Sequence, residues 1–112
     1  MNYKDLVVWQ KAMQMVAEVY RLTEQFPDSE RFGLTSQMRR AAVSIPSNIA
    51  EGSRRRTRKD TRQFLHIAYS SGSELETQVE LSRMLKFAND TSKLEQLLSE
   101  VMRMLNTMVN KD

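Results

Sequence analysis

Residues 5–26 read DLVVWQKAMQMVAEVYRLTEQF, and apolar side chains recur in this segment every three or four positions. That spacing is typical of an amphipathic α-helix. One apolar stripe contains Leu6, Trp9, Met13, Val16 and Tyr20, and a second stripe beside it contains Val8, Ala12, Met15, Val19, Leu22 and Phe26. Together they cover about 200° of the circumference, about twice the apolar face of an ordinary surface helix. We therefore expect a helix over residues 5–26 that is buried on two sides.

A second copy of the chain is the simplest partner for the extra apolar side of this helix. We predict self-association, with Val8, Met15, Val19 and Leu22 at the interface between copies. The alternative is that the helix is the most central element of a monomer.

Residues 34–53 form a second predicted helix, because their apolar side chains again recur on one face. Gly52 is a natural C-terminal stop. Pro46 lies inside the segment, where it removes a backbone hydrogen bond and crowds the carbonyl of Ala42. We expect the helix to kink or break locally at Pro46 without ending there.

Two further helices are predicted over residues 58–88 and 92–110. Each has a polar pair at capping-box spacing near its start; the pairs are Thr57 with Asp60 and Ser92 with Glu95. The small residues 70–73 in the third helix suit a close approach of another helix, and the alternative is a helix break.

The 112 residues are enough for one domain, and no strand pattern occurs among them. The sequence therefore predicts a single all-α domain over residues 1–112, an antiparallel up-and-down four-helix bundle. No apolar run approaches the length of a membrane span and no signal-peptide pattern is present, so we expect a cytoplasmic protein without membrane contact.

The residue types that the chain has argue against an enzyme. The chain has no cysteine, and His66 is its single histidine, so neither a thiolate zinc site nor a two-histidine metal centre can form. We expect no metal, no cofactor and no catalytic residue. The nearest catalytic pattern is Arg62 followed by His66, which is similar to that of helical ribonucleases of the HEPN class but with too short a spacing.

The positive charge is concentrated in residues 52–62, which read GSRRRTRKDTR. This segment has six basic and one acidic residue, whereas residues 1–51 have six of each and residues 63–112 have five basic and seven acidic. We call its six cations the basic cluster; they are Arg54, Arg55, Arg56, Arg58, Lys59 and Arg62. Such a concentration predicts contact with phosphates of RNA or DNA. The alternative is a solvated turn.

Two more arginines, Arg39 and Arg40, lie away from the apolar face of the second helix. They either extend the basic surface or form ion pairs with Glu30, Glu51 or a neighbouring copy, and we favour ion pairing.

Residues 32–52, which read FGLTSQMRRAAVSIPSNIAEG, resemble the signature of the four-helix bundle proteins known as 23S rRNA-intervening-sequence or S23 proteins. Asp5-Leu6 with Trp9-Gln10, and the third-helix stretch from Phe64, are similar too. The resemblance implies a bacterial protein that assembles as a homopentameric ring of bundles. It also implies kinship with the accessory variability protein of diversity-generating retroelements, which works beside a reverse transcriptase and binds nucleic acid through a basic surface.

Residues and resemblance together predict a non-catalytic oligomeric scaffold that binds RNA or DNA through the basic cluster. A protein partner such as a reverse transcriptase is compatible with this prediction. The alternative is a protein-interaction scaffold that binds no nucleic acid, and a weaker alternative is a ribonuclease that uses Arg62 and His66.

Overall fold

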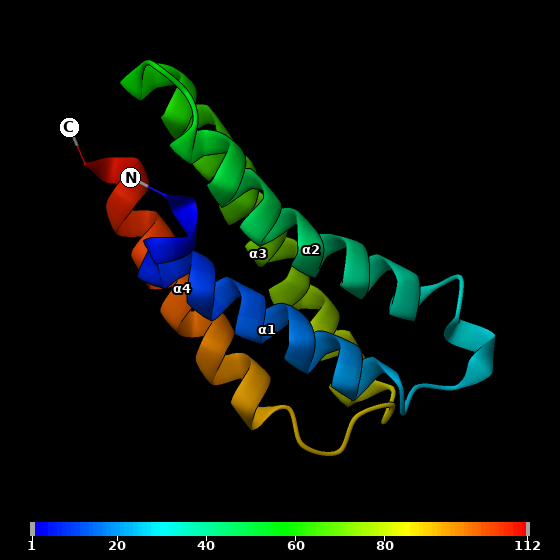
Figure 1. The fold of residues 1–112 in the computed structure, drawn as a ribbon. Helices are drawn as coiled ribbons and strands as arrows, with labels where there is room; N and C mark the ends of the chain where they lie inside the picture. The colour runs from blue at the N-terminus through cyan, green and yellow to red at the C-terminus, as the bar shows by residue number, and fades with distance from the viewer. Residues whose placement is uncertain (1, 112) are drawn as a thin grey trace.

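The computed structural model describes residues 2–111, which form a bundle of four long helices (Figure 1). The helices are α1 (Val7–Thr23), α2 (Leu34–Ser53), α3 (Arg58–Met84) and α4 (Ser92–Asn110), with short 3-10 helices η1 (Tyr3–Asp5) and η2 (Asp28–Glu30). Helix α1 packs against α2 and α4, and α3 packs against the same two helices. Residues 2–111 contain no strand. The predicted all-α four-helix fold is confirmed.

The core of the bundle contains the apolar stripe that we assigned to an interface between copies. Val8, Met15, Val19 and Leu22 are at most 4% exposed within one chain. That assignment is wrong, because side chains already buried against α2 and α4 have no surface left for a second copy. The other stripe of α1 is only partly covered: Met13 is 44% and Tyr20 41% exposed, while Leu6, Trp9 and Val16 are partly buried against the core.

The first and third helices are shorter than predicted. Helix α1 begins at Val7 because the preceding residues form η1, and it ends at Thr23 rather than at Phe26. Helix α3 ends at Met84, four residues before Ala88. It ends because Lys86 adopts a left-handed backbone conformation with φ of 62°, while the N–H of Phe87 donates to the carbonyl of Ser82 at 2.9 Å.

Helix α2 matches its predicted range and does not break at Pro46. The side-chain amide of Asn48 donates to the carbonyl of Ser44, one turn earlier on the same helix, at 2.8 Å. Gly52 is buried near the end of α2, where an added Cβ would lie 3.2 Å from the Cβ of Phe64. The glycine therefore lets α2 and α3 approach closely before the turn that joins them.

The predicted cap of α3 is confirmed, because the hydroxyl of Thr57 accepts a hydrogen bond from the N–H of Asp60 at 3.1 Å. The cap predicted for α4 is wrong by one residue. Thr91, not Ser92, is the N-cap of α4, and its hydroxyl donates to Glu95 at 2.6 Å. Residues 70–73 stay helical, and the space above Gly72 is filled by the side chain of Met102.

Candidate nucleic-acid interface

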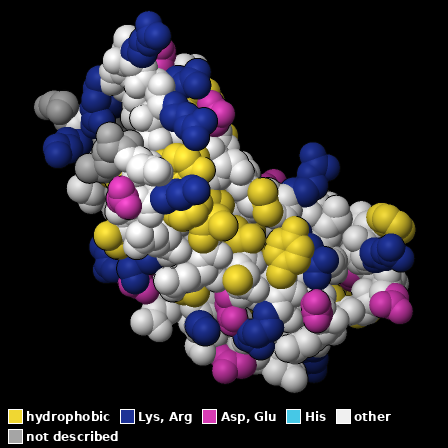
Figure 2. All heavy atoms as spheres, in the orientation of Figure 1, with side chains coloured by type: hydrophobic (Ala, Val, Ile, Leu, Met, Phe, Trp, Pro, Cys, Tyr) yellow, Lys and Arg dark blue, Asp and Glu magenta, His cyan; other side chains and the backbone are white. Residues whose placement is uncertain are grey.

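The basic cluster lies at one end of the bundle, on the turn between α2 and α3. The ribbon passes close to both chain termini at this end (Figure 1). Figure 2 shows Lys and Arg side chains gathered over the same end. All six cations except the half-buried Arg62 are exposed. The end is therefore rich in positive charge that solvent, or a ligand, can reach.

Arg54 and Arg55 at the end of α2 stack on aromatic rings. The guanidinium carbon of Arg54 lies 5.2 Å from the ring centre of Tyr3, and that of Arg55 lies 5.2 Å from the ring centre of Phe64. Arg55 also forms an ion pair with Glu51 at 3.0 Å. These contacts orient both side chains but reduce the free charge of Arg55.

Arg58 and Arg62 on the first turns of α3 reach the C-terminal end of α4. Arg58 donates to the carbonyl of Met108 at 2.9 Å and also to that of Lys111, and Arg62 donates to the carbonyl of Lys111 at 2.9 Å. The last carbonyls of a helix lack partners within it, and the helix dipole favours cations there. Both arginines therefore have a structural role that the sequence pattern did not reveal.

Arg56 and Lys59 are the members of the basic cluster with the freest charge. Both are exposed, and neither forms an ion pair or hydrogen bond through its side chain with another residue of the described range 2–111. Arg56 lies in the turn, and Lys59 lies on the first turn of α3. Their charges are available to phosphate while the internal contacts of the bundle stay in place.

Arg39 does not form the ion pair that we favoured for it. Its Nε donates to the hydroxyl of Thr23 at 2.9 Å, and its guanidinium carbon lies 4.4 Å from the ring centre of Tyr20. The predicted acidic partners are occupied elsewhere, since Glu30 accepts from the N–H of Leu34 at 3.0 Å. Arg40 is exposed and forms no ion pair within residues 2–111.

The two residues of the pattern that is similar to a ribonuclease motif have different surroundings. Arg62 donates a hydrogen bond to the carbonyl of Lys111, and its Nε is buried without a hydrogen-bond partner in the described part of the chain. His66 is exposed on α3. No group of acidic, histidine or cysteine side chains that suits a metal ion occurs among residues 2–111.

The opposite end of the bundle holds the most buried charge. Glu18 is 5% exposed and accepts two hydrogen bonds from Arg21, at 2.7 and 2.5 Å. These bonds lower the pKa of Glu18 and raise that of Arg21. Nearby, Ser92 donates its hydroxyl and backbone N–H to Asp90, which lowers the pKa of Asp90. These contacts are structural.

The sequence profile of the 23S rRNA-intervening sequence protein family matches residues 4–107. The chain belongs to this family. As a member of the 23S rRNA-intervening sequence protein family, it carries the basic cluster inside the matched range. No curated protein shows significant sequence similarity to it.

A solved structure supports the fold of this family member. It is the 1.70 Å crystal structure of a protein of unknown function from the S23 ribosomal protein family of Bacteroides thetaiotaomicron VPI-5482. The TM-score is 0.83 at 21% sequence identity, over 94% of this chain and 100% of that one. Neither comparison indicates a catalytic family. Within residues 2–111, no helix combines the length and the apolar character that a bilayer crossing requires.

Proposed function

We propose that the protein is a non-catalytic cytoplasmic scaffold that binds RNA or DNA through the basic cluster. The observation that carries the proposal is the pair Arg56 and Lys59, exposed at the end of the bundle without an acidic partner in the described chain. Arg54, stacked on Tyr3, extends the same surface. Cations placed this way bind phosphates mainly through release of counterions, with affinity that falls steeply with salt.

Self-association is the second part of the proposal. The exposed surface of α1 around Met13 lies beside α2, and a hollow of about 350 Å³ there is lined by Trp9, Met13, Val16, Pro46 and neighbouring residues, of which Tyr20 is not one. Figure 2 shows hydrophobic side chains gathered over α1 and α2. A second copy that covers this surface would remove it from water. A homopentamer, the assembly that the family resemblance implies, would multiply the basic ends that one nucleic acid can contact.

The proposal is tested by fluorescence-anisotropy titration of a labelled RNA hairpin and a DNA duplex. The variant Arg56→Asn/Lys59→Asn removes two positive charges from the basic end, while Arg58 and Arg62 keep their contacts with α4. We expect its affinity at low salt to fall about tenfold or more, since each phosphate that the protein no longer neutralises removes a salt-dependent part of the binding free energy.

The matched control is Lys86→Asn/Lys93→Asn at the opposite end of the bundle. Lys93 is the second residue of α4 as Lys59 is of α3, and Lys86 lies in a turn as Arg56 does. Asparagine tolerates the positive φ of residue 86. The control should bind as the wild type does. Equal losses in both variants would mean non-specific attraction, and absence of binding at low salt would favour the protein-interaction scaffold.

A further inference from the structure

A groove between α1 and α2 has a volume of about 640 Å³. It lies at the end of α2 away from the basic cluster; Arg39 and Arg54 are separated by 15 residues, about 22 Å along a helix. We call it the Tyr20 groove. Its lining residues are Tyr20, Arg31, Phe32, Thr35, Ser36, Arg39, Arg40, Val43 and Ser44. A volume of this size suits a ligand as large as a nucleotide.

The lining of the Tyr20 groove has an unusual chemistry. Three of the nine residues are arginines, two are aromatic, three are serine or threonine and none is acidic. Arginine next to exposed aromatic rings, without carboxylates, favours a ligand that combines a negative charge with a flat ring. Arginines of the basic cluster also lie over aromatic rings, those of Tyr3 and Phe64, but both of these rings are half-buried, whereas Phe32 in the groove is 89% exposed.

Arg39 is held in place to receive an anion. Its Nε donates to Thr23, whose hydroxyl in turn donates to the carbonyl of Val19 at 2.7 Å, and its plane lies over Tyr20. Its two terminal nitrogens form no hydrogen bond with another residue of the range 2–111. A guanidinium fixed in this way can donate two parallel hydrogen bonds to a phosphate with little loss of side-chain entropy.

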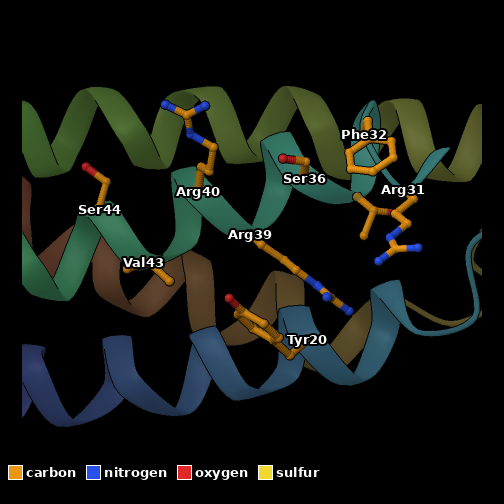
Figure 3. A pocket seen from close by; sticks show the side chains of 9 residues that line it. Tyr20, Arg31, Phe32, Ser36, Arg39, Arg40, Val43 and Ser44 are labelled. Atoms are coloured by element: carbon orange, nitrogen blue, oxygen red, sulfur yellow. The ribbon is translucent and has the colours of Figure 1, made fainter.

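Phe32 supplies the aromatic surface. It is 89% exposed, the highest value among the large hydrophobic residues, and the guanidinium carbon of Arg31 lies 5.4 Å from its ring centre. Figure 3 shows Phe32 and Arg31 at one end of the groove, with Arg39 directed toward Tyr20 and α1. Burial in the bundle does not explain this ring, whereas stacking with a base would.

We propose that the Tyr20 groove binds an unpaired base and the adjoining phosphate of single-stranded nucleic acid. Phe32 stacks on the base, and Arg39 and Arg31 bind the phosphate. This inference rests on the proposed function and adds to it a preference for unpaired strands, which the basic cluster alone does not supply.

The test compares two labelled single strands of about twelve nucleotides, one with bases and one abasic along its whole length, by anisotropy at fixed salt. The wild type should bind the base-bearing strand about tenfold more tightly, and Phe32→Ala should abolish that difference. Phe32→Trp should retain it, because the larger ring still stacks. Met84→Ala removes another side chain that is 74% exposed, outside the groove, and serves as the control.

Three results would overturn the inference. The first is equal affinity of the wild type for the two strands. The second is an unchanged preference in Phe32→Ala. The third is a smaller molar mass of Phe32→Ala than of the wild type by light scattering, which would assign the groove to a second copy. If the protein binds the duplex but shows no preference for the base-bearing strand, base binding by the Tyr20 groove is refuted while phosphate binding by the basic cluster is retained. The two proposals can therefore fail separately.

Discussion

Glu18 shows how one side chain can be almost buried and still charged. Arg21 lies one turn further along α1 and donates two hydrogen bonds to the carboxylate, which offsets the cost of its burial and lowers the pKa of Glu18. A carboxyl whose pKa is lower in the folded than in the unfolded state stabilises the fold above its unfolded-state pKa. That stability is lost as the pH falls through the folded-state pKa.

The first prediction concerns the variant Glu18→Gln. At pH 7 it should lower the free energy of unfolding by about 1–2 kcal/mol, because hydrogen bonds to a charged partner are lost. The difference from wild type should shrink as the pH falls below the ordinary pKa of a glutamate. Denaturant unfolding at several pH values measures this, with the exposed Glu76→Gln as control. If the difference in unfolding free energy between wild type and Glu18→Gln does not depend on pH, the stabilising role of the charged Glu18–Arg21 pair is refuted.

At the scale of helices, the start of α3 was predictable, the start of α4 was missed by one residue, and neither the end of α3 nor the contacts of α3 with α4 were predictable. Thr57 caps α3 as its spacing with Asp60 predicted, because both partners lie within one turn. Lys86 ends α3 in a left-handed conformation that a lysine does not signal in a sequence. Arg58 contacts the carbonyl of Met108, 50 residues away, which no local pattern can reveal.

The second prediction concerns this contact of α3 with the end of α4. Arg58→Ala/Arg62→Ala should destabilise the last turn of α4 by about 1–2 kcal/mol, since carbonyls at the helix end lose their donors. Amide hydrogen exchange should show faster exchange there, while Lys59→Asn should leave the rate unchanged. Unchanged exchange in the double variant would mean that the arginines do not support α4.

The third prediction concerns the packing of α3 on α4 at Gly72. An added Cβ would lie 2.2 Å from the sulfur of Met102, so Gly72→Ala should cost about 1 kcal/mol net despite the better helix propensity of alanine. In a Met102→Ala background the same change should instead stabilise by up to about 1 kcal/mol. Thermal or urea unfolding of the four proteins measures the coupling. Additive effects would contradict the packing explanation.

At the scale of the whole molecule, hydrophobic periodicity predicted the bundle but not which side of α1 faces inward. Both stripes of α1 are apolar, and only the positions of α2 and α4 show that Val8 and Met15 belong to the core and Met13 to the surface. The position of the basic cluster on a turn was predictable from composition. The Tyr20 groove was not predictable from the sequence, because Tyr20 and Phe32 come together only through the packing of α1 beside α2.

The fourth prediction follows from the exposed surface of α1 around Met13. The wild type should be an oligomer by light scattering at micromolar concentration, and Met13→Glu should lower the molar mass to that of a monomer while helical content is retained. A charge at this exposed position opposes burial against a second copy. Gln14→Glu adds the same charge to an exposed neighbouring position and should leave the mass unchanged. A monomeric wild type would contradict self-association.

The most direct test of nucleic-acid binding by the basic end is the salt dependence of affinity for a DNA duplex. We expect the logarithm of the association constant of the wild type to fall linearly and steeply with the logarithm of salt concentration. In Arg56→Asn/Lys59→Asn the slope should be smaller by about two units, one for each phosphate that the variant no longer neutralises. A shallow slope for the wild type, or the same slope in both proteins, would contradict the proposal that these side chains bind phosphate.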